Sequence, residues 1–550
     1  MMLSLSSAQL GDLAAVSSKL ILLSILLVPL GLLSLYLHNT PSTWKDSRRK
    51  NLPPGPKGYP FIGNLLDLAD SELVRAKAID WHQRFGDIFY TKIGGTDYIW
   101  LSSPKAVKDC LDKKSNIYSS RSPAPFAQDV ASGGKRQLFM NYGPAWRNLR
   151  KSSHALLNAN SAIKYQPIQD FESKQLMVEL IDSPEKFYQH NRRYSASVVM
   201  LLTYGYRLPK WDHPLVKQIY TVLDNLTEMT APGAHAVDSF PSLAKLPQQL
   251  LGNWRSHAEK VFAYDSQVYM GLWEALKKGV DDGSVAECFC KDYYLADPKK
   301  HGIDDLQAAY MCGGLVEAGS ETTSTTLNNF VLAMLLFPEA TAKAQEEIDR
   351  VIGSSRMPTW EDEADLPYVR ALVKETLRWR AVNKFGMPHY TTDDDWYEGY
   401  FIPKNSVVML NWWAIHMNSE LYKDPETFDP SRYLDKPLSA AEYINVNDPY
   451  ERDHFTYGAG RRVCPGVHVA ERSLYINIAR TLWGFKITKP IGADGKPIEP
   501  DTTMIRGFLS VPRPFQADFT VRSPSHAATI RKTFEAAEKE GINIQRSRLN

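Results

Sequence analysis

Strand-like runs occur in only two regions of this chain, and this distribution limits the folds that it can adopt. Residues of strand type cluster near the start, at 88–93 and 98–101, and near the end, at 401–410, 485–488 and 515–521. Helical patterns fill the interval between them, for example at 170–181, 215–230, 304–336 and 338–352. A doubly wound nucleotide-binding sheet needs strands that alternate with helices, so the pattern disfavours it. The sequence predicts a mostly α body with a small β-sheet region.

An apolar segment near the N-terminus predicts a membrane anchor. Residues 20–37 carry no charge over eighteen positions, which is close to the shortest helix that crosses a bilayer. A cleaved signal peptide is the alternative, but no Ala-x-Ala-like cleavage site follows. The next residues include a tryptophan and a basic cluster, namely Trp44, Lys45, Arg48, Arg49 and Lys50. Because positive charge collects on the cytoplasmic side, we expect one membrane pass with the rest of the chain in the cytosol.

These features divide the chain into four parts. Residues 1–43 are the predicted anchor, with its helix at about 20–37. Residues 44–60 are a basic hinge, which its prolines keep stiff and non-helical. Residues 61–521 form the globular body, and residues 522–550 form a charged, helix-prone tail that we expect at the surface.

Net charge and cysteine usage exclude two classes of protein. A formal charge of +2 gives no case for nucleic-acid binding, which normally needs a concentrated basic surface. The five cysteines, at 110, 288, 290, 312 and 464, are odd in number and scattered, so we expect no disulfide framework. This usage is typical of a reducing compartment such as the cytosol.

Cys464 has unusual neighbours, with two glycines and two arginines before it and a Pro-Gly pair after it. A buried packing cysteine is the commonest alternative and would not need this setting. A zinc site could use His454, Cys464 and His468, but their spacing matches no common zinc module. A nucleophilic cysteine would need a histidine base, and the sequence does not exclude one. A dinucleotide loop is disfavoured because its third glycine is misplaced and no strand leads into it.

An axial ligand to haem iron is the interpretation that uses every feature of this stretch. Pro465 suits the first position of a helix, so Cys464 would sit at a helix N-terminus that stabilises its thiolate. Gly458 and the nearby glycines would bring the backbone close to a flat cofactor, with Tyr457 beside the sulfur. Arg462 could reach an anionic group on the rim of the cofactor. A thiolate ligand of this kind favours cleavage of the O–O bond.

The stretch F-T-Y-G-A-G-R-R-V-C-P-G, residues 455–466, resembles the haem-ligand loop of the cytochrome P450 family of haem-thiolate monooxygenases. The resemblance implies a cytochrome P450 fold over 61–521 and makes Cys464 the axial ligand of haem b. It also assigns Tyr457, Gly458 and Arg462 to the cofactor site. Tyr457 departs from the family pattern, which usually has a phenylalanine seven residues before the cysteine.

Other motifs of the family follow in the expected order. Glu375 and Arg378 form an i,i+3 pair, which alone would indicate an ordinary surface ion pair on a helix. The resemblance adds Arg432 from D-P-E-T-F-D-P-S-R-Y and makes the three residues a buried structural triad that holds the haem loop. W-R-N-L-R supplies Trp146 and Arg150, one helical turn apart. The resemblance assigns these two to a haem propionate, together with His389 and Arg121.

The hexapeptide A-G-S-E-T-T at 318–323 lies within a long helical pattern. A glycine and hydroxyl residues in mid-helix can open a kink, and the alternative is a packing notch against another helix. In the family this groove lies over the haem, so the resemblance makes Thr322 a hydrogen-bond donor to dioxygen and Glu321 a proton relay. A positioned hydroxyl and acid can supply the protons that O–O cleavage needs.

These motifs imply a monooxygenase that inserts one oxygen atom from O2 into a small hydrophobic substrate. No flavin or nicotinamide domain is visible, so NADPH would supply electrons through a separate cytochrome P450 reductase, with cytochrome b5 as a second donor. The basic residues Arg147, Lys151, Arg461 and Arg472 could present a surface to an acidic flavoprotein. With the anchor, the resemblance implies the endoplasmic reticulum membrane, lipid contact and a cytosolic catalytic domain.

Substrate choice would lie in less regular segments, namely 123–140, 227–240, 310–318, 381–388 and 507–511. Asn383, Lys384 and Phe385 are unusual because the middle of this loop is generally apolar in the family. One hypothesis is that Asn383 or Lys384 hydrogen-bonds the substrate, and the alternative is a lysine that reaches solvent. The overall resemblance is to fungal microsomal members of secondary metabolism, including mycotoxin biosynthesis and the hydroxylation of polyketide aromatics.

Two other classes of function remain open. A haem-thiolate isomerase or dehydratase would not use O2, and Thr322 and Glu321 count against it. A non-catalytic haem sensor would need neither a reductase nor a membrane anchor. Turnover that depends on NADPH and reductase would separate both from a monooxygenase.

Overall fold

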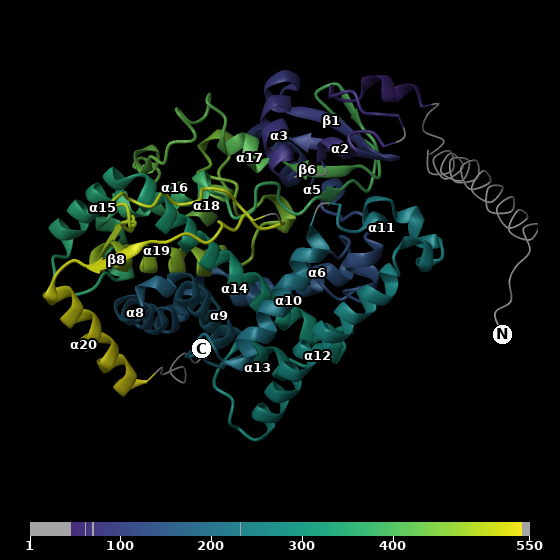
Figure 1. The fold of residues 1–550 in the computed structure, drawn as a ribbon. Coiled ribbons are helices and arrows are strands. Elements are labelled where there is room, and N and C mark those ends of the chain that lie inside the picture. The colour runs from purple at the N-terminus through teal and green to yellow at the C-terminus, as the bar shows by residue number, and fades with distance from the viewer. Residues whose placement is uncertain (1–45, 61, 69–70, 232, 506, 542–550) are drawn as a thin grey trace, which may run out of the picture.

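The computed structural model describes residues 46–60, 62–68, 71–231, 233–505 and 507–541 (Figure 1). The predicted anchor helix at 20–37 and the last residues of the predicted tail lie outside these ranges. Among the described helices, none combines the length and the apolar character that a bilayer crossing requires.

The first half of the described chain is helical apart from two strands, β1 (Ile88–Ile93) and β2 (Thr96–Leu101). Its helices are α2 (Leu65–Leu68), α3 (Ser71–Phe85), α4 (Pro104–Val107), α5 (Ser115–Tyr118), α6 (Pro144–Leu157), α7 (Ala159–Lys164), α8 (Gln166–Asp182), α9 (Phe187–Tyr204), α10 (Pro214–Thr230), α11 (Ala236–Ser239) and α12 (Trp254–Asp281).

The second half contains the remaining strands among its helices. The helices are α13 (Phe289–Leu295), α14 (Asp305–Leu336), α15 (Pro338–Val351), α16 (Pro367–Trp379), α17 (Trp412–His416), α18 (Ala440–Ile444), α19 (Val467–Gly484) and α20 (Pro524–Glu540). The strands are β3 (His389–Tyr390), β4 (Asp395–Tyr397), β5 (Tyr400–Ile402), β6 (Val407–Leu410), β7 (Phe485–Thr488) and β8 (Asp518–Val521). The predicted mostly α fold is confirmed, and α8, α10, α14 and α15 match the predicted helices to within a few residues.

The small sheet lies at one end of the molecule, beside α2, α3 and α17 (Figure 1). Its order is β1-β2-β6-β3, with β2 and β6 parallel and the other neighbours antiparallel. The run at 401–410, predicted as one strand, is divided between β5 and β6, which pair in different sheets. Pro403 has no N–H for a strand ladder, and Asn405 has a φ of 63°, so the chain turns here.

Helix α14 passes through the centre of the helical region and packs against α9, α12, α16 and α19. Leu327, Leu332 and Met334 of α14 are buried in the main apolar cluster with residues of α8, α9, α16 and α19. Because neighbours cover several sides of α14, it is buried over most of its length rather than along one stripe. The helix therefore provides a rigid support for the candidate residues Glu321 and Thr322.

The two ends of the described chain are both attached to the body. Near the start, Arg49 of the predicted hinge makes a two-pronged ion pair with Asp97 of β2, at 2.7 and 2.9 Å. At the other end, the residues predicted as a surface tail form α20, which packs against α8. Ile530 of α20 is fully buried, and the ring of Phe534 meets that of Phe171 edge-on at 5.8 Å.

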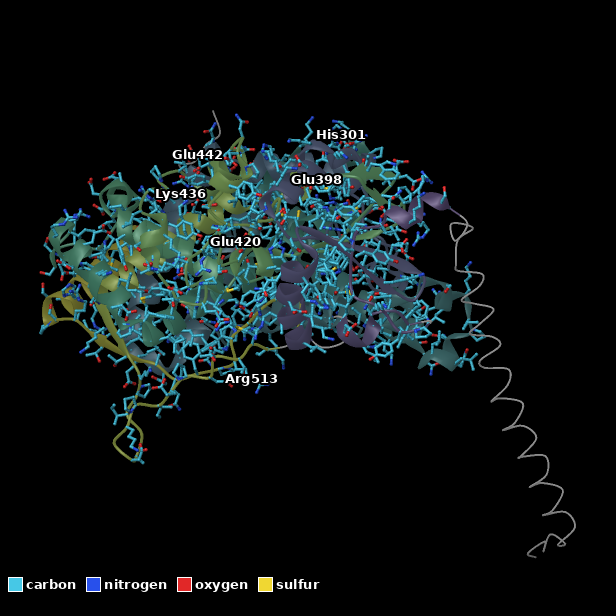
Figure 2. The ribbon with its side chains drawn as sticks, turned by 90° about the horizontal axis from the view of Figure 1, so that it is seen from above. His301, Glu398, Glu420, Lys436, Glu442 and Arg513 are labelled. Carbon is cyan, nitrogen blue, oxygen red and sulfur yellow. The ribbon has the colours of Figure 1, made fainter. Side chains whose placement is uncertain are left out.

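Charged side chains of both signs cover the outside of the molecule. Glu398, Glu420 and Glu442 are exposed at the surface that Figure 2 presents. Lys436 on the same face pairs with Glu451 at 2.7 Å. This mixed surface agrees with the net charge of +2.

Candidate functional site

Cys464 lies on a loop between the helical turn η12 (Gly460–Arg462) and helix α19. The backbone N–H of Cys464 donates to the carbonyl of Tyr457 at 2.8 Å, which closes the loop. Burial raises the pKa of the Cys464 thiol, and the N–H of Gly466 acts in the opposite direction. The prediction that Pro465 begins the helix is wrong, because Gly466 is the N-cap and the first helical residue is Val467, two positions after Pro465. The thiol still receives a backbone N–H from the helix start.

The glycines of this loop serve different purposes. Gly458 and Gly460 have φ values of 74° and 66°, a region that favours glycine. A side chain on Gly460 would clash with the backbone carbonyl of Leu111, so this residue allows close packing against the protein itself. Tyr457 is buried, and its hydroxyl oxygen has no hydrogen-bond partner in the described structure. Burial raises the pKa of Tyr457, so the phenol stays neutral.

Two arginines and a tryptophan gather beside the Cys464 loop. The guanidinium carbon of Arg462 lies 4.4 Å from the ring centre of Trp146, and that of Arg150 lies 6.0 Å from it. Arg150 donates to the carbonyl of Val463, next to the cysteine. Arg462 donates to the carbonyl of Met140 at 2.6 Å. The predicted Trp146, Arg150 and Arg462 are thus brought together by α6 and the loop before α19.

Two more predicted haem-site residues lie near Arg462, namely Arg121, which follows α5, and His389 of β3. His389 begins β3, and its Nδ1 atom lies 2.7 Å from the carbonyl oxygen of Tyr118. Arg121 donates to the carbonyls of Leu138 and Met387, at 3.0 and 2.7 Å. Both side chains are buried, with exposed fractions of 6% for Arg121 and 3% for His389.

These cations lack nearby counter-charges. Within the described part of the chain, no carboxylate forms an ion pair with Arg121, Arg150 or Arg462, and each guanidinium donates to backbone carbonyls. Burial together with Arg150 lowers the pKa of Arg462 to about 9. Burial and the charge of Arg462 also lower the pKa of Arg121, and burial and Arg121 lower that of His389. A buried or part-buried group of cations of this kind favours an anionic ligand, and the propionates of a haem fit that requirement.

Two members of the predicted triad lie on α16, and the third, Arg432, comes from the short 3-10 helix Pro430–Tyr433. Arg378 donates to both carboxylate oxygens of Glu375, at 2.6 and 2.7 Å, and neither side chain is exposed. The Nε atom of Arg432 lies 3.5 Å from the same carboxylate. Arg378 also donates to the carbonyl of His416 at 2.8 Å, and the His416 ring accepts the backbone N–H of Phe455 at 2.9 Å. The triad is therefore connected by hydrogen bonds to the start of the Cys464 loop.

For the A-G-S-E-T-T hexapeptide of α14, the structure favours the packing-notch alternative over an opened kink. The helix is continuous from Asp305 to Leu336. Its hydroxyl side chains bond to carbonyls one turn earlier, as Ser320 does to Val316 at 2.6 Å, which leaves the backbone ladder intact. A Cβ atom on Gly319 would lie 2.9 Å from Val199 of α9, so this glycine is a packing notch.

Glu321 and Thr322 have different environments on this helix. Thr322 is part-exposed, and its hydroxyl donates to the carbonyl of Ala318 at 2.8 Å. Glu321 is buried against α9, where Arg192 donates to one of its oxygens at 2.7 Å. Its other oxygen, Oε2, is buried without a hydrogen-bond partner in the described structure. Burial raises the pKa of Glu321, and Arg192 partly offsets this change.

The three substrate-pocket candidates make contacts within the protein. Asn383 accepts the backbone N–H of Phe385 at 3.2 Å. The ammonium of Lys384 lies 5.4 Å from the ring centre of Trp413, and the side chain is only 8% exposed, so it does not extend into solvent. The ring of Phe385 packs edge-on against Trp100 at 5.9 Å. The substrate role of these residues stays a prediction.

A buried network of charged and polar side chains beside α14 was not predicted from the sequence. Arg136 pairs with Asp265 of α12 at 2.6 Å and with Glu317 of α14. Asn225 of α10 donates to Asp265 at 2.7 Å, and Tyr269 of α12 donates to Glu317 at 2.6 Å. The paired charges lie 129 and 181 positions apart in the chain, so no local pattern could have revealed them. The network connects the loop before α6 to three helices.

The zinc alternative for His454, Cys464 and His468 is wrong. Across the residues that the structure describes, no group of three histidine, cysteine or acidic side chains is arranged to hold a metal ion. His454 is instead buried beside Asp453 and the ring of Tyr457.

Comparison with known proteins gives a consistent result. The family model described as cytochrome P450 matches residues 53–519. The cytochrome P450 monooxygenase verL of Clonostachys rogersoniana is 48% identical over 520 residues, which cover 94% of this chain and 95% of verL. The monooxygenase virE of Hypocrea virens is 39% identical, with 89% and 88% covered, and yanC of Aspergillus niger is 37% identical, with 93% and 97% covered.

Proposed function

This chain belongs to the cytochrome P450 family, and on that premise we propose that it is a haem-thiolate monooxygenase that inserts one oxygen atom from O2 into an aromatic or polyketide-derived secondary metabolite. The relatives compared above are named as monooxygenases and align over most of both chains, which supports the reaction class. The secondary-metabolite substrate rests on the overall resemblance of the sequence.

The haem would be held by residues from four parts of the chain. Cys464 would supply the thiolate ligand, and Tyr457 and Gly458 shape the loop that carries it. The propionates would be bound by the three arginines already described, Arg121, Arg150 and Arg462, with Trp146 and His389 beside them. When bound, a thiolate-ligated haem activates O2 for the insertion of one oxygen atom and the reduction of the other to water.

The observation that carries this proposal is the unpaired positive charge beside Cys464. The guanidiniums of Arg121, which is buried, and of Arg150 and Arg462, which are part-buried, would repel one another in a protein without a cofactor. The charge of Arg150 lowers the pKa of Arg462, and the charge of Arg462 lowers that of Arg121. Their nearest polar contacts are neutral carbonyls, which do not cancel a charge. An anionic group with two carboxylates resolves this imbalance.

Proton delivery would use Glu321 and Thr322. Arg192, which pairs with Glu321, has a side chain that is 33% exposed, so the pair extends from solvent to the buried carboxyl. The raised pKa of Glu321 helps it to hold a proton, and its unpartnered Oε2 atom can pass this proton on. The Thr322 hydroxyl would give up its bond to Ala318 to donate toward the reacting oxygen.

Electrons would come from NADPH through a separate cytochrome P450 reductase, with cytochrome b5 as a second donor. Of the four predicted basic residues, Arg147, Lys151 and Arg461 are exposed and Arg472 is part-buried, which supports a basic docking surface formed by the first three. We also propose that residues 1–43 anchor the protein in the endoplasmic reticulum membrane and contact lipid. The hinge at 44–60 would then fix the orientation of the cytosolic catalytic domain, 61–521, relative to the membrane. The segment 522–550 would lie at the surface of that domain.

The carbon monoxide difference spectrum of the reduced protein tests the proposal. A Soret band typical of thiolate ligation is expected for the wild type, and Cys464→Ser should abolish it. Product formation should then require NADPH, reductase and O2 together. An isomerase or dehydratase would turn over without O2, and a haem sensor would not turn over at all.

A further inference from the structure

Residues 136–140, a segment before α6, supply carbonyl acceptors to two arginines of the proposed haem site. Arg121 donates to the carbonyl of Leu138 at 3.0 Å, and Arg462 donates to that of Met140 at 2.6 Å. A guanidinium that is taken out of water needs acceptors for its N–H groups, and those acceptors fix its position. The position of this segment therefore helps to determine where both cationic side chains lie.

The first residue of the segment is held by charge. Arg136 is only 2% exposed, and it pairs with Asp265 of α12 at 2.6 Å and with Glu317 of α14. Just before it, the side chain of Gln307 of α14 donates to the carbonyl of Lys135 at 2.8 Å. The segment is thus attached to two long helices at its start.

Two tight turns connect this attachment to the two carbonyls. The backbone N–H of Phe139 donates to the carbonyl of Arg136 at 3.1 Å, and that of Met140 donates to the carbonyl of Gln137 at 3.4 Å. The side chain of Phe139 is buried, which further limits the movement of the segment. Leu138 and Met140 are only two and four positions beyond Arg136, so a displacement of Arg136 would move their carbonyls as well.

Arg136 is the cation for two buried carboxylates. Asp265 and Glu317 also accept hydrogen bonds from Asn225 and Tyr269, but both of these donors are neutral. Removing the charge of Arg136 would leave the two carboxylates buried without a counter-ion, which is strongly unfavourable. The segment would then have to move to admit water to them.

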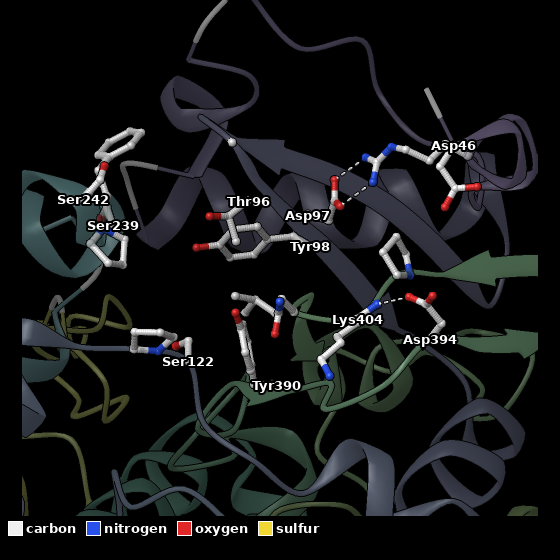
Figure 3. Close-up of a pocket in the computed structure, with 18 of the residues that line it drawn as sticks. Asp46, Thr96, Asp97, Tyr98, Ser122, Ser239, Ser242, Tyr390, Asp394 and Lys404 are labelled. Carbon is white, nitrogen blue, oxygen red and sulfur yellow. Dashed lines mark hydrogen bonds and ion pairs between the residues drawn. The ribbon is translucent and has the colours of Figure 1, made fainter. Parts of the chain in front are cut away.

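The segment is separate from the cavity that Figure 3 shows at the start of the sheet. This cavity of about 500 Å³ is lined by Ser122 and Tyr390, the residues that follow Arg121 and His389. Residues 135–140 do not line it. An effect of Arg136 on the proposed haem site would therefore not result from a change in the lining of this cavity.

We propose that Arg136 is a positioning residue for the haem, because it anchors to α12 and α14 the segment whose carbonyls orient Arg121 and Arg462. Arg136 acts through the backbone, since its own ion pairs go to the two helices. Its role toward the haem rests on the proposed function, whereas the anchoring of the segment does not.

Two measurements on the holoenzyme test the proposal. Hydrogen–deuterium exchange reports the protection of residues 137–142, and haem transfer to apomyoglobin reports how firmly the cofactor is held. In Arg136→Met we expect both rates to rise about tenfold, the size expected when one bond to a charged group is lost. Arg136→Lys keeps the charge but not the planar fork, so its rates should lie between those of the wild type and Arg136→Met.

Arg193→Met is the matched control. Arg193 is 1% exposed and pairs with Glu172 and Glu179 of α8, so its substitution also breaks a buried pairing with two carboxylates. Because the partners of Arg193 lie on α8, both rates should change by less than about twofold. If Arg136→Met does not retain haem during purification, Glu317→Gln takes its place and should raise both rates about threefold, since the pair with Asp265 remains.

Unchanged exchange of residues 137–142 in Arg136→Met would overturn the anchoring. Faster exchange with unchanged haem transfer would overturn the role toward the haem, and so would an equal acceleration of haem transfer in Arg193→Met. A wild-type sample without the thiolate Soret band would instead refute the proposed function, and the exchange measurement would still decide whether Arg136 anchors the segment.

Discussion

Neutralising Glu375 should strongly destabilise the protein, because it leaves the charge of Arg378 buried without a counter-ion. In Glu375→Gln, the two charge-assisted bonds at 2.6 and 2.7 Å become bonds to a neutral amide at best. Arg378 has no exposed surface through which water could compensate. Breaking a buried ion pair on one side costs about 3–5 kcal/mol, so we expect a loss of this size in the free energy of unfolding.

The double variant Glu375→Gln, Arg378→Met separates the effect of charge from that of packing. It removes the uncompensated cation but also the bonds that Arg378 donates to the carbonyls of His416 and Pro425, both at 2.8 Å. Two unsatisfied carbonyls cost about 2 kcal/mol together. The double variant should therefore be more stable than Glu375→Gln alone, although it carries more substitutions.

Urea unfolding followed by tryptophan fluorescence measures these differences from the midpoints and slopes. The control is Asp182→Asn, which breaks the exposed pair with Arg531 and should cost less than about 1 kcal/mol. The carbon monoxide spectrum should also change in Glu375→Gln, since Arg378 is linked through His416 to Phe455 in the Cys464 loop. The reasoning is refuted if Glu375→Gln costs less than about 1 kcal/mol, or if the double variant is the less stable of the two.

Four further predictions follow from the site. Arg462→Met should accelerate haem transfer to apomyoglobin about tenfold, because one charge-assisted contact to a propionate is lost. Arg462→Lys should give a rate between those of the wild type and Arg462→Met, and an unchanged rate in Arg462→Met would contradict the assignment of Arg462 to a propionate. Glu321→Gln should reduce product formed per NADPH about 100-fold and release peroxide instead, and full coupling would exclude Glu321 as the relay. Burial raises the pKa of Asp265 to about 6, so the folded state binds this proton more tightly than the unfolded state. The free energy of unfolding should therefore fall as the pH rises from about 4 to 6. In Asp265→Asn, the urea midpoint should depend less on pH over that range. Lys384→Met tests the predicted role of Lys384 in substrate binding. Because the ammonium of Lys384 lies over the ring of Trp413, we expect the spectral dissociation constant of a substrate to change less than twofold. A large increase in this constant would support the predicted role instead.

The fold could be predicted where a local pattern determines the element. Helix α10 was expected at 215–230 and occurs at Pro214–Thr230, because its apolar residues recur with helical spacing and proline suits its start. The run at 401–410 was wrongly predicted as one strand, because β-branched and apolar residues lie on both sides of Pro403. The α14 hexapeptide suggested a kink because it contains a glycine and hydroxyl residues. In the structure its hydroxyls bond within the helix, and its glycine leaves room for Val199 of α9.

The same division applies to the candidate site. Glu375 and Arg378 are three positions apart, so their pairing could be expected from spacing alone, although their burial could not. Arg192, the partner of Glu321, is 129 positions away on α9, and nothing in the sequence around it marks it as special. Contacts between helices depend on crossing geometry, which hydrophobic spacing does not encode at the level of single side chains.

The charges on α14 illustrate why such distant arginines are needed. Glu317 and Glu321 are four residues apart, so they lie on the same side of the helix, and both are buried. Two carboxylates in this position repel one another and lose hydration, so each requires a cation of its own. Arg136 from the loop before α6 serves Glu317, and Arg192 from α9 serves Glu321. Because Arg136 is also paired with Asp265, displacing that loop would leave Glu317 unpaired one turn from the proposed proton relay. The two carboxylates of α14 are therefore neutralised by arginines from two different segments, over residues that no single sequence motif contains.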